Sequence, residues 1–186
     1  MNYKYKKDKI IIIDFGSQVT KLIARRIRDY KVYSEILTIK DLNKKNIFKN
    51  VKGIILSGGP STVIGKKFPT IPENIFDLNI PILGICYGLQ LIVKYFKGNI
   101  KSNITKREFG RTLLIENKKS LLTKGFFYNK KNNVWMSHQD SVYKLPKGFI
   151  NIASTNESTM TIIENKKKIY MEFNFIQKSH IQQMEN

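Results

Sequence analysis

The sequence is poor in several residues on which other classes of protein depend. It has one cysteine in 186 residues, so no disulfide can form within the chain, which is typical of a reducing, cytoplasmic compartment. No apolar run approaches the ~20 residues that a membrane span needs, and the basic segment 1–9 has no apolar signal region. We therefore expect a single cytoplasmic domain over residues 1–186, with no membrane partner.

Acidic residues are also scarce. There are 14 of them against 33 basic residues, which gives a formal net charge of +19 and raises the question of nucleic-acid binding. However, 28 of the basic residues are lysines scattered along the chain, and no basic helix carries interleaved aromatic side chains. Lysine, isoleucine and asparagine are all abundant and share A/T-rich codons, so codon bias explains the charge. We expect no nucleic-acid partner; the alternative depends on charge alone.

Apolar strand patterns alternate with helical patterns in the first half of the chain. Strands are predicted at 9–15, 32–37, 53–57 and 80–85, and helices at 17–30, 41–50, 73–78 and directly after residue 86. Ser17 is the expected N-cap of the first helix. This alternation predicts an open α/β fold with a mostly parallel sheet flanked by helices. After Gly98, short strand patterns without helices predict antiparallel hairpins in the C-terminal half.

The lone cysteine occupies a distinctive position. Cys86 follows the apolar run 80–85, precedes a helical pattern, and has Gly84 and Gly88 two residues to either side. This arrangement is typical of a nucleophile elbow, a strand-to-helix turn too tight for side chains at the flanking positions. It places the thiol at a helix N-terminus, where we expect a pKa below the usual ~8.5. The alternative is a buried structural cysteine.

A glycine pair supplies a second part of the predicted site. Gly58 and Gly59 follow the strand at 53–57, and their N–H groups are free of side-chain shielding. The amides of Tyr87 and Gly59 are the expected oxyanion hole for an acyl group attacked by Cys86. Because the carboxyl ends of parallel strands build the site in such sheets, we expect 14–18, 57–61 and Cys86 to converge.

These motifs resemble one family. Gly84-Ile85-Cys86-Tyr87-Gly88-Leu89-Gln90 is similar to the nucleophile elbow of class I glutamine amidotransferases. The likeness covers residues 9–170. Further segments within this range resemble the GMP synthase branch of that family, and these are 14–18, 24–26, 56–60, 106–110, 135–138 and 152–155.

The resemblance implies a flavodoxin-like amidotransferase fold and a definite chemistry. Cys86 would attack the side-chain amide of glutamine, giving a γ-glutamyl thioester, glutamate and ammonia. The ammonia would pass to an ATP-pyrophosphatase domain or subunit that converts XMP to GMP. That part, which is absent from this sequence, would use ATP and Mg²⁺, whereas this domain needs no cofactor or metal. The residues implied to bind glutamine are Gly58, Gly59, Gln90, Ser137 and His138; Gln139 departs from the family's usual glycine.

The family's catalytic histidine and glutamate are missing. They belong to a late strand that ends in His-Pro-Glu, where this chain has Phe175, Ile176 and Gln177. The chain has two histidines. His180 lies in the tail and matches no functional position of the family, and His138 is favoured as a polar residue of the pocket or as a structural residue. We therefore expect glutaminase activity lower by several orders of magnitude. The alternative is a catalytically dead remnant or a glutamine-binding module.

The tail 171–186 has a simple origin in the genetic code. The codons of residues 171–186 can be chosen, within the degeneracy of the genetic code, so that a second reading frame also encodes a sensible sequence. Read from the third base of the Met171 codon, that frame gives Gly-Ile-Gln-Phe-His-Pro-Glu-Val-Ser-His-Thr-Thr-Asn-Gly. A run of lysines, Lys166 to Lys168, implies a run of adenines just upstream. We infer that the tail is a frame-shifted reading of an amidotransferase gene. Sequencing the gene tests this: every tail codon should fit the second frame, and one incompatible codon would refute the idea.

Overall fold

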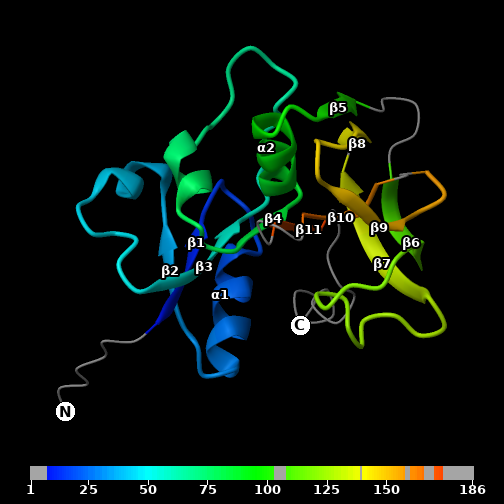
Figure 1. The fold of residues 1–186 in the computed structure, drawn as a ribbon, viewed down its shortest axis with the longest axis horizontal. Helices are drawn as coiled ribbons and strands as arrows, with labels where there is room; N and C mark the ends of the chain where they lie inside the picture. Colours follow the sequence, from blue (N-terminus) through cyan, green and yellow to red (C-terminus); the bar gives the residue numbers. More distant parts are fainter. Residues whose placement is uncertain (1–7, 103–107, 139, 158–159, 166–169, 174–186) are drawn as a thin grey trace.

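The computed structural model describes residues 8–102, 108–138, 140–157, 160–165 and 170–173 (Figure 1). Within this part of the chain, nine strands form one sheet in the order β2-β1-β3-β4-β11-β10-β9-β6-β7. The first five are parallel. They are β2 (Tyr33–Leu37), β1 (Lys9–Ile13), β3 (Val51–Leu56), β4 (Ile82–Ile85) and β11 (Tyr170–Phe173).

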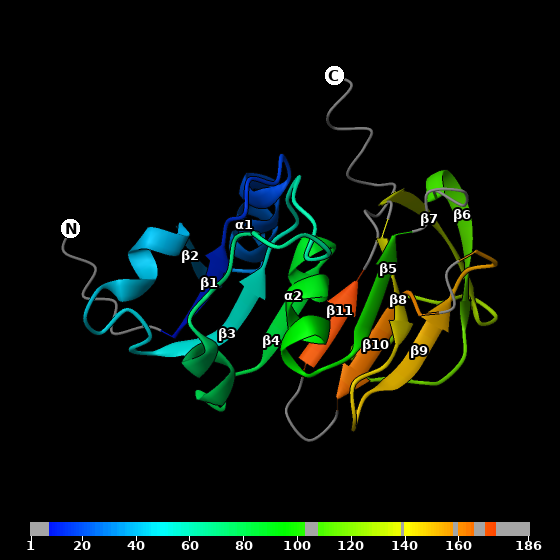
Figure 2. The ribbon, with the colours of Figure 1, turned by 90° about the horizontal axis from the view of Figure 1, so that it is seen from above.

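The other strands are antiparallel, as the sequence predicts for the C-terminal half. Four of them continue the sheet beyond β11, and Figure 2 shows how they extend it away from the parallel half. They are β10 (Ile162–Asn165), β9 (Ile150–Ser154), β6 (Glu108–Glu116) and β7 (Lys131–His138). A separate ribbon pairs β5 (Asn99–Ser102), which the sequence did not predict, with β8 (Asp140–Lys144).

Helices lie on both sides of the parallel strands. In Figure 1, α1 (Thr20–Asp29) lies below the strands, and α2 (Tyr87–Tyr95) lies above them. Right-handed crossovers that run in opposite directions along the sheet place their helices on opposite faces. Two 3₁₀ turns, η1 (Ile39–Asn43) and η2 (Glu73–Asp77), complete the connections. Among the described residues, no helix is both long enough and apolar enough to span a membrane.

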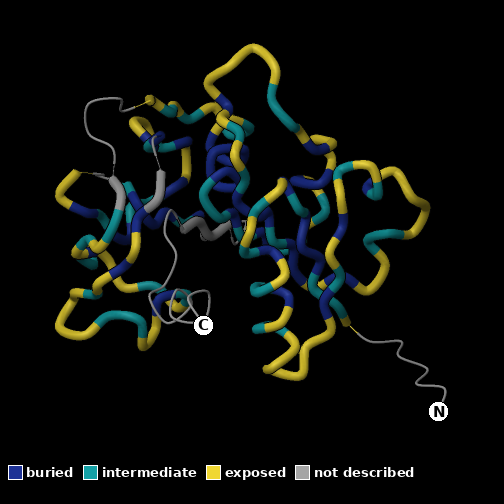
Figure 3. Tube along the Cα trace, turned by 180° about the vertical axis from the view of Figure 1, so that it is seen from behind, coloured by how far each residue is buried: buried dark blue, intermediate teal, exposed yellow. Residues whose placement is uncertain are grey.

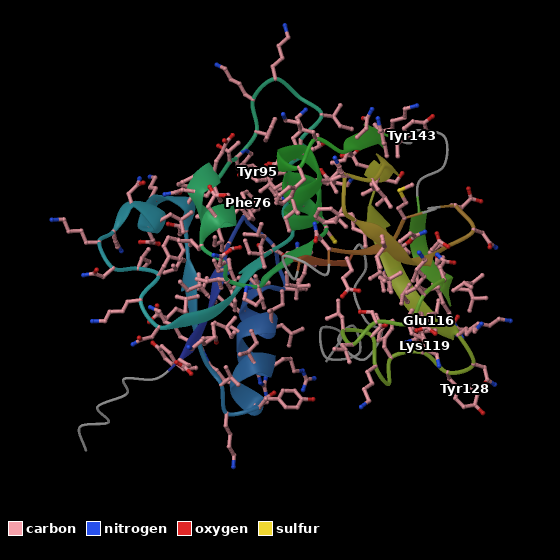
Figure 4. The ribbon with its side chains drawn as sticks, viewed as in Figure 1. Phe76, Tyr95, Glu116, Lys119, Tyr128 and Tyr143 are labelled. Atoms are coloured by element: carbon pink, nitrogen blue, oxygen red, sulfur yellow. The ribbon has the colours of Figure 1, made fainter. Side chains whose placement is uncertain are left out.

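The core explains why these strands are central. Ile11, Ile12 and Ile13 are all completely buried, so β1 is covered on both faces, as its continuous apolar run predicts. The buried segments follow the strands and α2 through the middle of the molecule (Figure 3). Phe76 of η2 stacks on Tyr95 of α2 with ring centroids 4.1 Å apart (Figure 4), which fixes the far end of the helix that begins at the elbow.

Two local predictions are wrong in detail. Helix α1 begins at Thr20, and Val19 rather than Ser17 is its N-cap. The reason is Asp14, whose Oδ1 accepts hydrogen bonds from the N–H of Gly16, the N–H of Ser17 and the hydroxyl of Thr20. These bonds close a turn that delays the helix. The predicted helix at 41–50 is the 3₁₀ turn η1, which begins and ends earlier.

Gly88 offers a direct test of the packing. A Cβ on Gly88 would lie 2.2 Å from the carbonyl oxygen of Leu56, so Gly88→Ala should destabilise the fold by about 3 kcal/mol. This reverses the usual preference for alanine over glycine in a helix. In the control Gly65→Ala, the new Cβ would be 3.8 Å from the nearest atom, and stability should change by less than about 0.5 kcal/mol. Urea unfolding measures both; equal stabilities would contradict the packing.

Candidate active site

Cys86 lies at a strained turn between β4 and α2. Its backbone has φ 49° and ψ −102°, a left-handed φ that a residue with a side chain rarely adopts. Such a conformation persists only where the surrounding structure enforces it, and it is typical of functional sites. The turn leaves the residue half-buried, and its sulfur is a thiol that forms no disulfide. This is the geometry expected of a nucleophile elbow.

The two flanking glycines enforce the turn. A Cβ on Gly84 would lie 2.7 Å from the backbone of both Gly88 and Leu89, and one on Gly88 would meet Leu56 at the end of β3. No side chain fits at either position. The prediction that glycines are needed two residues before and after Cys86 is thus confirmed in steric terms.

The three predicted segments do converge. The hydroxyl of Ser57 accepts a hydrogen bond from the N–H of Phe15 (3.0 Å), and the carbonyl of Ser57 accepts one from the N–H of Gly88 (3.1 Å). The Cβ position of Gly58 lies 3.5 Å from Ser17 Oγ and 3.6 Å from Cys86 Cβ. The loops after β1, β3 and β4 therefore form one cluster at the carboxyl end of the parallel strands, as expected for this class of sheet.

The two amides predicted for an oxyanion hole lie in this cluster. Tyr87 is the first residue of α2, so its N–H has no acceptor within the helix. Gly59 packs tightly on the preceding loop, because a Cβ there would be 2.5 Å from the carbonyl oxygen of Phe15. Backbone donors at the start of a helix and in a glycine loop suit a developing oxyanion. Their assignment as oxyanion donors remains a prediction.

Side chains on α2 hold the loop after β3 against the elbow. The Tyr87 hydroxyl donates to the carbonyl of Pro69, and its ring meets that of Phe15 edge-on, with centroids 5.1 Å apart. Gln90 is buried, and its Oε1 accepts a hydrogen bond from the N–H of Val63 (3.3 Å). The sequence prediction gave Gln90 a role in binding glutamine, and the structure gives it a bond to this loop as well.

Ser137 and His138 lie on a strand that is not a neighbour of β4, the strand that leads to Cys86. They are the last two residues of β7, and four strands separate β7 from β4 in the sheet order. Their side chains and all of Gln139 lie outside the described residues, so their predicted contact with glutamine stays a prediction.

A hollow in the described structure lies away from the elbow. A cavity of about 950 Å³ lies between β10 and the loop after β6, with Glu116, Lys119, Leu121, Phe127 and Glu164 among its lining residues. Glu116 and Lys119 are far from α2 in Figure 4. Among the described residues, no three His, Cys, Asp or Glu side chains lie close enough to hold a metal ion.

The electrostatics of the thiol differ from the expectation. Burial raises the pKa of the Cys86 thiol to about 11, because desolvation disfavours the charged thiolate. The lowered pKa expected from the helix N-terminus is therefore wrong for the resting chain. A partial charge at a helix end is worth at most about 2 kcal/mol, and no cationic side chain of the described residues adds to it. The thiol needs a partner to become a nucleophile at neutral pH.

Strand β11 lies next to β4 in the sheet. β11 runs parallel to β4, and its last residue, Phe173, pairs with Ile85, the residue before Cys86. The described part of β11 therefore ends beside the residue that precedes the elbow. Residues 174–186, including Phe175 and Gln177, lie outside the described residues.

Comparison with known proteins decides the family. The sequence profile described as glutamine amidotransferase class-I matches residues 11–171. The chain belongs to the class I glutamine amidotransferase family. It is 44% identical over 164 residues to "GMP synthase [glutamine-hydrolyzing]" of Helicobacter pylori (strain HPAG1), a match that covers 88% of this chain and 32% of that protein. For the Malacoplasma penetrans (strain HF-2) protein of the same name, identity is 48%, with 87% and 31% covered.

Solved structures agree with this class I amidotransferase fold. The crystal structure of a putative GMP synthase protein from Thermoplasma acidophilum superposes with a TM-score of 0.77 at 26% identity, covering 91% of this chain and 83% of that one. A glutamine amidotransferase from Thermotoga maritima has a TM-score of 0.73 at 16% identity, covering 91% and 75%. The chain spans about a third of the length of the curated relatives it matches.

Ser57 belongs to the segment 57–61 that was predicted to converge on the site, but no role of its own was predicted for it. Ser57 is fully buried at the end of β3 and bonds to both neighbouring loops. A polar residue that ends a continuous apolar strand, directly before a glycine pair, was the available signal.

The raised pKa predicts how the thiol reacts. The alkylation of Cys86 by iodoacetamide should accelerate about tenfold per pH unit from pH 7 to 10, because only the thiolate reacts and its pKa is about 11. In the urea-unfolded chain, the same cysteine should have an ordinary pKa near ~8.5 and its rate should level off above about pH 9.5. Intact-mass kinetics measure both; a folded-state plateau below pH 8 would contradict the desolvation.

Proposed function

We propose that this chain is the glutamine-hydrolysing part of a GMP synthase, in which Cys86 is the nucleophile. The observation that carries the proposal is the strained elbow at Cys86, packed against the Gly58–Gly59 loop. The chain also shares 44–48% identity with segments of proteins named glutamine-hydrolysing GMP synthases. A nucleophile beside backbone donors suits acyl transfer.

The proposed reaction has two halves. The Cys86 sulfur attacks the side-chain carbonyl carbon of glutamine, and the amides of Tyr87 and Gly59 stabilise the oxyanion. The C–N bond then breaks: ammonia leaves with a proton from a general acid, and a γ-glutamyl thioester remains. Water attacks the thioester, which releases glutamate and returns the thiol. Gly58, Gln90, Ser137 and His138 are the proposed glutamine-binding residues.

The chain lacks the proton-transfer group that the reaction needs. The register of β11 with β4 supports a general acid in the residues that follow Phe173, where the family resemblance implies histidine at position 175. This chain has Phe175 there. It keeps the nucleophile but lacks the group that takes the thiol proton and returns it to ammonia. We propose that it binds glutamine and hydrolyses it at least a thousandfold more slowly than a complete enzyme.

The proposed destination of ammonia is an ATP-pyrophosphatase domain or subunit that converts XMP to GMP. Support comes from the name of the relatives, GMP synthase, and from their length, of which this chain matches about a third. Any ATP and Mg²⁺ chemistry belongs to that other part. An inactive remnant that only binds glutamine is the second candidate, favoured by the absence of a histidine at position 175.

Restoring the tail tests the proposal. The triple variant Phe175→His, Ile176→Pro, Gln177→Glu restores the missing residues at the positions that the family resemblance implies for them. It should hydrolyse glutamine at least a hundredfold faster than the native chain, because the thiol regains a proton acceptor and ammonia a proton donor. Coupled detection of glutamate measures the rate.

Two controls accompany this test. Adding Cys86→Ser to the triple variant should abolish the gain, and Phe175→Ala with Gln177→Ala should leave the native rate unchanged. A native chain that already hydrolyses glutamine at ordinary enzyme rates would refute the assigned base. A gain that survives Cys86→Ser would refute the nucleophile.

A further inference from the structure

Ser57 joins all three loops of the site although it is completely buried. Its backbone N–H donates to the carbonyl of Ile13 (3.0 Å), and its carbonyl accepts from the N–H of Gly88 (3.1 Å). Its hydroxyl accepts from the N–H of Phe15 (3.0 Å) and donates to the carbonyl of Gly58 (2.8 Å). A hydroxyl has one proton to donate. Here that proton is directed to Gly58.

The hydrogen bond that Ser57 donates to the Gly58 carbonyl also constrains the direction of the Gly59 N–H. That carbonyl belongs to the same peptide plane as the N–H of Gly59, the proposed oxyanion donor. The described chain has no cis peptide bonds, so the carbonyl and the N–H point in opposite directions. Whatever fixes the direction of the Gly58 carbonyl also fixes the direction of the Gly59 N–H, on a loop whose Gly58 lies against Cys86.

This peptide plane is otherwise easy to turn. It lies between two glycines, which lack the Cβ atoms that restrict backbone rotation elsewhere. The line of hydrogen bonds from the Phe15 N–H through the Ser57 hydroxyl to the Gly58 carbonyl favours one orientation, and successive bonds strengthen one another.

We propose that Ser57 is a positioning residue, which holds the Gly58–Gly59 peptide so that the Gly59 N–H faces the acyl group on Cys86. Ser57 does not touch the substrate in this role; it acts through Gly59. The inference rests on the proposed function, because it needs an oxyanion at Cys86. It adds a residue whose loss would weaken the oxyanion hole while leaving the nucleophile in place.

The test compares two reagents on the native chain and on Ser57→Ala. A chloroketone analogue of glutamine carries a ketone oxygen where glutamine has its amide oxygen. The Cys86 sulfur adds to the ketone carbon, which develops an oxyanion, and then displaces the neighbouring chloride to form a carbon–sulfur bond. The thiol proton passes to solvent, and chloride, unlike ammonia, leaves without a proton donor, so the reaction proceeds in a chain that lacks the base. Iodoacetamide alkylates the same thiol by direct displacement, with no oxyanion. Intact-mass kinetics over a range of chloroketone concentrations give the limiting rate and the half-saturating concentration.

In Ser57→Ala the limiting chloroketone rate should fall at least about fivefold, with the half-saturating concentration and the iodoacetamide rate unchanged. Ser34→Ala is the matched control. Ser34 is equally buried, and its hydroxyl accepts from Arg28 Nε and donates to the Ala24 carbonyl, remote from Cys86. This variant should keep the native chloroketone rate.

Unchanged chloroketone kinetics in Ser57→Ala, or equal slowing with both reagents, would overturn the role of Ser57. If Ser57→Ala does not fold by urea unfolding, Ser57→Cys supplies the test: its weaker hydrogen bonds should give a smaller fall, and peptide mapping assigns the label to Cys86. A different outcome is a native chain that reacts with iodoacetamide while its chloroketone rate rises linearly with concentration and reaches no limit. That result would overturn the proposed function, and this inference with it.

Discussion

The close approach between the first turn of α2 and the carbonyl end of β3 determines the geometry of the site. A Cβ on Gly88 would lie 2.2 Å from the Leu56 carbonyl oxygen, so the helix lies directly on the strand end. That contact brings the Gly88 N–H to the Ser57 carbonyl and the glycine loop to Cys86. It also leaves no room for a relaxed turn, and Cys86 takes the left-handed backbone that presents its thiol.

The parallel half of the fold and the elbow were accessible from sequence because their signals are local. The run 9–13 is apolar at every position after Lys9, which indicates a strand buried on both faces, and the spacing of Gly84, Cys86 and Gly88 specifies a tight strand-to-helix turn. The order of the antiparallel strands depends on contacts between distant segments, so no local pattern predicts it. Strand β5, with one partly buried residue among its four, has too weak an apolar alternation to detect.

The two errors within the site have physical causes that sequence does not show. Asp14 accepts three hydrogen bonds before α1, and this network, rather than Ser17, decides where the helix begins. The thiol pKa depends on the balance of burial against the helix dipole. Sequence reveals the helix but not the depth of burial, and in the folded chain desolvation wins.

The chain thus combines a well-formed nucleophile turn with a tail that lacks the residues to serve it. The register of Phe173 with Ile85 places the described start of this tail, residues 171–173, beside the strand that leads to Cys86. Four of the five parallel strands, the elbow and the glycine loop all precede it in the chain. On this account the fold retains the acyl-transfer geometry, and the defect is confined to proton transfer.

The central claim is that acyl transfer passes through a thioester on Cys86. The most direct measurement is product partitioning with hydroxylamine in the chain whose tail again carries His-Pro-Glu, because hydroxylamine captures a thioester as γ-glutamyl hydroxamate. The account predicts that hydroxamate replaces glutamate as hydroxylamine is raised, and that none forms in the same chain with Cys86→Ser. Glutamate as the sole product at every hydroxylamine concentration would contradict it, because water would then attack glutamine directly.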